Sequence, residues 1–176
     1  MLRLVPGDSR PARRGTLKGA VHSGPILIGY DGSPASDHAL REAAALLGPR
    51  SALVVVVWEA GAAYATLEGP EIPAAPIDLR TAALTDQALY EGARQTAHLG
   101  ARLAAELGFE AESLTVADDV TVAKTLVRLA RERDAQAIVV GAHGHSRLEK
   151  LFLGSTSRQV LEHTHCPVLV VPQPGR

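Results

Sequence analysis

An unbroken apolar run, ALVVVVW at residues 52–58, constrains the fold of this 176-residue chain more than any other segment. A strand with one exposed face alternates apolar and polar residues, whereas this run has no polar position. It therefore predicts a strand covered on both faces, as in a parallel sheet with helices on either side. Apolar residues make up 46% of the chain but aromatic residues only 3%, so the core is expected to be built from Ala, Val and Leu.

Four further strands and four helices are predicted to alternate with each other around this run. The strands are expected at 25–30, 110–116, 135–140 and 167–172, and the helices at 34–47, 81–107, 122–133 and 155–164. Only half of the residues in the strand at 110–116 are apolar, which predicts a position at an edge of the sheet. The alternation predicts a single α/β domain with a doubly wound parallel sheet and helices on both faces.

Local signals mark several ends of these elements. Ser33 and Thr121 are predicted N-caps, because a side-chain oxygen before a helix accepts from a free backbone N–H group. Gly92 and Gly100 are expected to weaken the long helix slightly. Residues 59–79, rich in Ala, Pro and Gly, predict a flexible loop that is either a plain connector or a lid beside the ligand.

The segment GAHGHSRLEKLFLGSTS, residues 141–157, contains three spaced glycines. It follows the predicted strand 135–140 and leads into the last helix. Glycine lets backbone N–H groups approach an anion, and a helix N-terminus adds unpaired N–H groups and a positive dipole end. The segment therefore predicts a phosphate-binding loop. No lysine follows the last glycine, which excludes a P-loop, and the glycine spacing does not fit the dinucleotide fingerprint.

The spacing Gly-x2-Gly-x9-Gly-Ser/Thr resembles the nucleotide-binding signature of the universal stress protein family, in its ATP-binding subtype. The similarity extends back through the run 52–58 to Asp31-Gly32-Ser33, so residues 23–174 are identified as one such domain. The resemblance implies a Rossmann-like fold with five strands in the order 3-2-1-4-5. In that order the Asp31 turn and the Gly141 loop open at one crevice, where open α/β sheets bind ligands.

This resemblance implies an adenine-nucleotide site for ATP, or for AMP or ADP, with Mg²⁺ or Mn²⁺ held through the phosphates. It implies that the Val57 backbone reads the base edge, with Trp58 also at the adenine and Val140 and Tyr30 as walls, although a core role fits Val57 equally. Asp31 is either a ribose or metal partner or an Asx-turn residue. The candidate nucleotide-binding residues are Asp31, Gly32, Ser33, Val57, Val140, Gly141, His143, Gly144, Gly154, Ser155, Thr156 and Ser157.

The sequence shows no dedicated carboxylate pair or fixed lysine for phosphoryl transfer, so no catalytic residue is predicted. The run from Glu162 to Cys166 holds potential metal ligands, but they are too close together in sequence to converge, and no protein metal site is predicted. We expect a nucleotide-responsive stress-adaptation or signalling protein. The alternatives are a slow ATPase or hydrolase-like enzyme, a nucleotide-free dimeric interaction module, and a cyclic AMP binder.

The net charge of −1 conceals an asymmetry between the start of the chain and the rest. Residues 1–22 hold five Lys and Arg against one Asp, or +4, which leaves −1 − 4 = −5 on the remainder. This basic arm is expected to be disordered, and the acidic body argues against nucleic-acid binding. No stretch approaches the roughly 20 apolar residues of a membrane span, so we expect a cytoplasmic protein. The resemblance implies a homodimer paired through the edge strand 167–172.

Overall fold

The computed structural model describes residues 22–61, 79–118, 120–142 and 153–173. Five strands and four helices alternate along these residues, as the sequence predicts. They are β1 (Ile26–Gly29), α1 (Pro34–Leu47), β2 (Ser51–Trp58), α3 (Leu79–Glu106), β3 (Glu110–Ala117), α4 (Val122–Glu132), β4 (Ala137–Gly141), α5 (Ser155–His163) and β5 (Val168–Val171).

The strands form one parallel sheet in the order β3-β2-β1-β4-β5, which confirms the predicted order. The half-apolar strand β3 lies at an edge, also as predicted, and pairs along its full length with β2, from Ser51↔Glu110 to Trp58↔Ala117. The order of strands reverses between β1 and β4, which are neighbours in space although most of the chain separates them in sequence. This reversal fixes where a crevice can open at the edge of the sheet.

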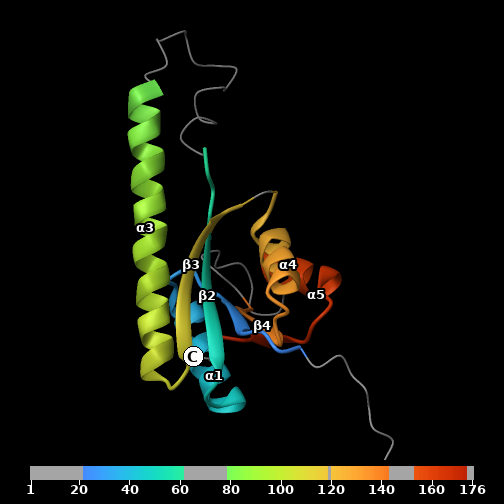
Figure 1. The fold of residues 1–176 in the computed structure, drawn as a ribbon. Helices are drawn as coiled ribbons and strands as arrows, with labels where there is room; N and C mark the ends of the chain where they lie inside the picture. Colours follow the sequence, from blue (N-terminus) through green and yellow to red (C-terminus); the bar gives the residue numbers. More distant parts are fainter. Residues whose placement is uncertain (1–21, 62–78, 119, 143–152, 174–176) are drawn as a thin grey trace, which may run out of the picture.

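Each face of the sheet carries its own apolar layer (Figure 1). Helices α1 and α3 cover one face, where Ile28, Val54 and Val56 point, and helices α4 and α5 cover the other, where Leu27 and Val55 point. Alternate residues of β2 thus enter opposite cores, and Ala52 to Val56 are all buried. The unbroken apolar run has the structural cause that the sequence indicates, because neither face of the strand meets water.

The predicted caps and helix limits hold closely. The N–H group of Ser36 donates to Ser33 Oγ at 3.2 Å, and that of Lys124 donates to Thr121 Oγ1 at 3.3 Å. Helix α3 begins at Leu79 and not at residue 81, so the prediction of a loop up to residue 79 is wrong at its last residue. Residues 62–78 of that predicted loop lie outside the described residues.

The two halves of helix α3 differ in how deeply their residues are buried. The apolar residues Leu84 and Leu89 of its first half are exposed, whereas most of its buried residues lie in its second half, from Ala97 to Ala104. The start of α3 extends past the end of β2 (Figure 1). No helix among the described residues is long and apolar enough to cross a membrane.

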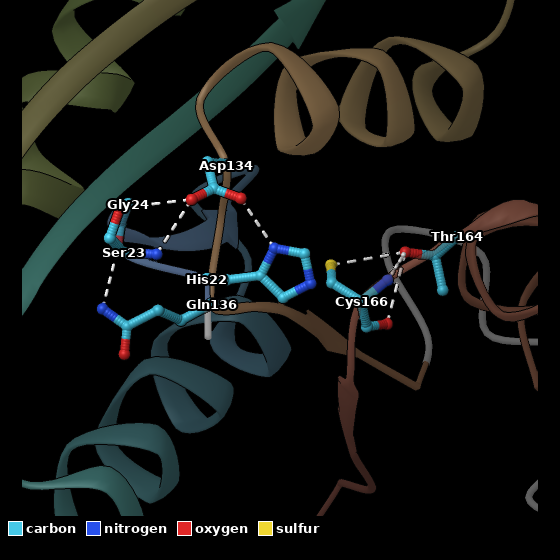
Figure 2. A network of polar contacts seen from close by, with 7 residues as sticks. All are labelled: His22, Ser23, Gly24, Asp134, Gln136, Thr164 and Cys166. Carbon is cyan, nitrogen blue, oxygen red and sulfur yellow. Dashed lines mark hydrogen bonds and ion pairs between the residues drawn. The ribbon is translucent and has the colours of Figure 1, made fainter. Parts of the chain in front are cut away.

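The start of the described chain is fastened to the turn between α4 and β4 (Figure 2). His22 Nδ1 lies 2.7 Å from Asp134 Oδ1, and the N–H group of Ser23 donates to Asp134 Oδ2 at 2.9 Å. Gly24 donates its N–H group to the carbonyl of Asp134 at 3.0 Å. His22, the last residue of the predicted disordered arm, is therefore held by the domain, whereas residues 1–21 lie outside the described residues.

Candidate functional site

A pocket of about 540 Å³ opens at the carboxyl ends of β1, β2 and β4. Its position coincides with the reversal of strand order, where ligands bind in open α/β sheets. Its volume lies within the range of small-molecule sites. Nine of the predicted residues line it together: Asp31, Ser33, Val57, Val140, Gly141, Gly154, Ser155, Thr156 and Ser157.

One predicted residue that the structure describes, Gly32, does not line this pocket. Gly32 lies in the turn after β1 with φ of +74°, a conformation that glycine adopts freely, and its role there is to shape the turn. His143 and Gly144 lie outside the described residues. The two motifs at Asp31 and Gly154 nevertheless meet at one site, as the strand order implies.

The turn after β1 is organised by Asp31. The N–H group of Ser33 donates to Asp31 Oδ1 at 3.0 Å, which is the Asx-turn geometry that the sequence left open. Asp31 also lines the pocket, where it is the only charged side chain among the described lining residues. The carboxylate therefore holds the turn and faces the cavity at the same time.

The two ends of the glycine segment are tied together beside the pocket. The N–H group of Gly154 donates to the carbonyl of Ala142 at 2.7 Å, and Ala142 donates its own N–H group to the carbonyl of Val171 in β5 at 2.7 Å. Ser157 Oγ lies within hydrogen-bond distance of the carbonyls of Ala142, at 3.2 Å, and Gly154, at 3.1 Å. Because Ser157 is only 1% exposed, its hydroxyl braces the loop ends.

Helix α5 begins directly at the pocket. Its N-cap is Gly154, which supplies no side-chain hydrogen bond, and Ser155 and Thr156 form its first turn. The first N–H groups of a helix have no acceptor within the helix and carry the positive end of its dipole. Ser155 is exposed and Thr156 half-buried, so this end of α5 can present N–H and hydroxyl donors to an anion.

The walls of the pocket come from both faces of the sheet. Val57, Leu126 and Val140 belong to the α4 side, whereas Tyr30 and Val56 belong to the α3 side. The alternation of side chains along β2 explains why neighbouring residues stand on opposite walls. The lining residues that the sequence did not identify are Gly29, Ser36, Val55, Val56, Ala93, Thr96, Val122, Leu126 and Ala142.

Tyr30 directly follows β1, and its side chain is largely buried. Its hydroxyl donates to Asp37 Oδ1 of helix α1 at 2.5 Å. Burial, and then the hydrogen bond to Asp37, raise the pKa of the Tyr30 phenol above its usual range. Tyr30 is therefore a neutral donor at physiological pH, and its ring is held on the α1 and α3 side of the pocket.

Trp58 does not line the pocket, although the resemblance places the end of β2 at the adenine. Its ring packs against Tyr90 of α3, with ring centroids 5.6 Å apart and an interplanar angle of 57°. Alternation along β2 directs Trp58 away from Val57 and towards α3. Cys166 is buried, and the described residues contain no group of three or more His, Cys, Asp or Glu side chains arranged to hold a metal ion.

Solved structures share this arrangement of sheet and helices. The hypothetical protein MJ0577 superposes with a TM-score of 0.69 at 20% identity, over 89% of this chain and 100% of that one. A universal stress protein from Archaeoglobus fulgidus, solved in complex with dAMP, gives 0.57 at 22% identity over 85% and 98% of the two chains. A universal stress protein solved in complex with cAMP gives 0.51 at 22% identity over 86% and 98%. At these identities the likeness shows a common fold.

Sequence comparison adds relatives of greater identity. A universal stress protein from Mycolicibacterium smegmatis is 33% identical over 159 residues, which cover 83% of this chain and 47% of the relative. Universal stress protein Rv1996 from Mycobacterium tuberculosis is 31% identical over 179 residues, covering 97% and 49%. The chain spans about half the length of these relatives. The model of the universal stress protein family matches residues 23–172, which include all five strands and the whole described pocket, and the chain belongs to that family.

Proposed function

We propose that this chain binds an adenine nucleotide of the ATP type in the pocket at the ends of β1, β2 and β4, and that it acts as a nucleotide-responsive protein of stress adaptation or signalling. The observation that carries the proposal is the start of helix α5 at the point where the strand order reverses. There, free N–H groups and a positive dipole end border a cavity of about 540 Å³. The dAMP and cAMP complexes of family members support the ligand class.

The phosphates are assigned to the α5 end of the pocket. Gly141 and Gly154 leave room for the ligand to approach the backbone, while Ser155 and Thr156 offer hydroxyl and N–H donors. Ser157 contributes mainly by bracing the loop, since its hydroxyl bonds with backbone carbonyls. The family signature adds His143 and Gly144 to this group. Charge-assisted hydrogen bonds of about 1.5–3 kcal/mol each make micromolar affinity, about −8 kcal/mol, attainable from a handful of them.

The base and the ribose are assigned to the strand ends. The backbone of Val57 would read the edge of the base, with Val140 on the α4 wall. Asp31 and Ser33 would meet the ribose, and Gly32 would shape the turn that holds them. The support is that Asp31, Ser33, Val57 and Val140 line the same pocket. Mg²⁺ or Mn²⁺ would be carried on the nucleotide phosphates, and among the described lining residues Asp31 is the one with a charged side chain. We further propose that two copies pair through the edge strand β5.

Binding, without turnover, is the output that the lining residues favour. Phosphoryl transfer needs a positioned base and a cation clamp near the γ-phosphate. Among the described lining residues, Asp31 is the sole carboxylate and no Lys or Arg is present. The form that acts in signalling would therefore be the nucleotide-bound protein.

The proposal is tested by calorimetry with ATP, ADP, AMP and cAMP on the wild type and on two variants of Ser155. Ser155→Glu places a negative charge at the first position of α5, which suits the helix dipole but repels phosphate, and should weaken ATP binding at least tenfold. Ser155→Ala removes the hydroxyl donor but keeps the N–H group and adds no charge, so it should weaken ATP binding less than Ser155→Glu does. A wild type that binds none of the four ligands below millimolar concentration would refute the proposal. Sustained phosphate release over many turnovers would favour the hydrolase alternative.

A further inference from the structure

Helix α3 forms one wall of the proposed nucleotide pocket, at residues that no nucleotide-binding motif includes. Ala93 and Thr96 line the cavity from the middle of α3, beside Tyr30 and Val56 from the strand ends. Thr96 Oγ1 donates to the carbonyl of Gly92 at 3.0 Å, so its hydroxyl is already engaged within the helix. What this wall offers to a ligand is therefore mostly apolar surface, which suits the flat face of a base better than a phosphate.

The ring of Tyr30 occupies its place because residue 100 has no side chain. A Cβ atom built on Gly100 would lie 2.7 Å from Cδ1 and 2.9 Å from Cε1 of Tyr30, and 2.9 Å from Cγ1 of Val54. Real Cβ atoms essentially never approach other atoms so closely, so a side chain at this position would have to displace the ring. Val54 is fully buried in the close-packed core and cannot move aside. The Tyr30 ring would therefore move toward the pocket, which Tyr30 lines.

Asp37 holds the other end of the same ring. Its carboxylate, in the first turn of α1, accepts the hydroxyl proton of Tyr30. The ring is thus fixed at its edge by α3 and at its hydroxyl by α1. Two contacts from two helices define one orientation of a side chain that lines the pocket.

The family resemblance implies Tyr30 as a wall at the base, and we propose that Gly100 and Asp37 are the positioning residues of this base-selecting wall on the α3 side of the pocket. This inference rests on the proposed function, since it concerns the same adenine nucleotide. The flat face of the purine packs against this wall, and the position of the wall determines how deeply the base enters the pocket. The phosphates remain at the start of α5, so changes in the wall alter affinity for the base and leave the phosphate contacts in place.

The test compares the affinities of ATP and AMP, which share the base and differ in phosphates. Gly100→Ala should weaken both by the same factor, at least tenfold, because the displaced ring enters the space of the base. Gly92→Ala is a matched control in the same helix, since a Cβ there meets nothing within 4 Å, and it should leave both affinities within twofold. Ser155→Glu should, by contrast, weaken ATP more than AMP.

Second variants separate the wall from a general loss of structure. In a Tyr30→Leu background, Gly100→Ala should cost less than threefold, because the ring that it displaces is gone. Asp37→Ala should weaken both ligands severalfold, whereas Asp37→Asn still accepts the phenol proton and should bind like the wild type. If Gly100→Ala does not fold, Ala93→Leu, which extends from the same wall at a half-buried helix position, should give the same equal loss for ATP and AMP.

The outcomes distinguish the two proposals. A wild type that binds neither ATP nor AMP refutes the proposed function. A wild type that binds both, with Gly100→Ala and Ala93→Leu folded and within twofold of its affinities, refutes the base-selecting wall alone. The wall is also refuted if either variant weakens ATP and AMP by clearly different factors, or if the loss in Gly100→Ala persists unchanged in the Tyr30→Leu background.

Discussion

Asp134 lies outside the pocket and holds the residues that precede β1 by several hydrogen bonds. It has a φ of +50°, in the left-handed region that Asp and Asn tolerate better than most residues. Its carboxylate accepts from the N–H group of Ser23 and contacts His22, and its carbonyl accepts from Gly24, so the turn before β4 fastens the strand that begins the domain (Figure 2). A residue with a side chain cannot replace Gly24 without displacing this turn, because its Cβ would lie 1.9 Å from the carbonyl oxygen of Arg133.

This residue predicts a pH dependence of stability. The hydrogen bond from the Ser23 N–H group, and then that from His22, hold the pKa of Asp134 below its usual range. A carboxyl with a depressed pKa stabilises the folded state above its unfolded pKa of about 3.9 and loses that contribution as pH falls through its folded pKa. Asp134→Asn keeps the tolerated backbone conformation and removes the charge. It should lower the melting temperature at pH 7, and this difference should shrink towards zero as the pH falls below about 3.9, measured by circular dichroism. An equal difference at pH 7 and at strongly acidic pH would contradict this account.

At the scale of the element, helix α4 depends on its cap. The helix has 11 residues, a length at which an isolated helix is marginal in water. Thr121 Oγ1 accepts from the N–H group of Lys124 and lies 3.4 Å from Oε1 of Gln159 in α5. The same hydroxyl therefore caps α4 and contacts α5, and both helices border the pocket.

Removing this hydroxyl should destabilise the domain. Thr121→Ala leaves the first turn of α4 without its side-chain acceptor and should lower the free energy of unfolding by about 1 kcal/mol. Thr121→Ser retains the hydroxyl and should recover most of the loss. Urea unfolding at constant m-value measures both variants. The cap account fails if Thr121→Ser is as unstable as Thr121→Ala.

Helix α3 shows where prediction from the sequence ends. Its existence follows from helical periodicity, but Gly92 and Gly100 look alike in the sequence and differ completely in the structure. Gly92 faces open space, whereas Gly100 accommodates the ring of Tyr30, 70 residues earlier. Leu84 and Leu89 fit the apolar pattern of the helix but are exposed. Such roles depend on which elements meet, and periodicity within one helix does not encode that.

For the whole molecule, the layered fold and the strand order could be predicted because each element carries a local signal and the family resemblance fixes their order. The meeting of Asp31 with Gly154 followed from that order. The α3 wall did not, since Ala93 and Thr96 belong to no motif and reach the pocket only through the packing of a helix across the end of the sheet. The residues of the two motifs are thus predictable from sequence, and the part of the site that α3 carries is not.

The edge of the sheet at β5 predicts the state of assembly. The N–H groups of Ile138 in β4 and of Ala142, which directly follows β4, donate to the carbonyls of Pro167 and Val171. The alternation of a parallel ladder therefore turns the N–H group of Val170 outward. An outward row of N–H and C=O groups on an apolar strand is a template for pairing with a second copy.

If two copies pair there, Val170→Pro removes one outward donor without breaking a bond to β4, because proline is tolerated on edge strands. The wild type should be a dimer by light scattering at micromolar concentration, and Val170→Pro a folded monomer. Val170→Thr, which keeps the N–H group and the branched shape, should remain dimeric. A monomeric wild type would refute pairing of any kind at these concentrations. A dimeric Val170→Pro would place the contact elsewhere, because a backbone ladder through β5 cannot form where its central donor is missing.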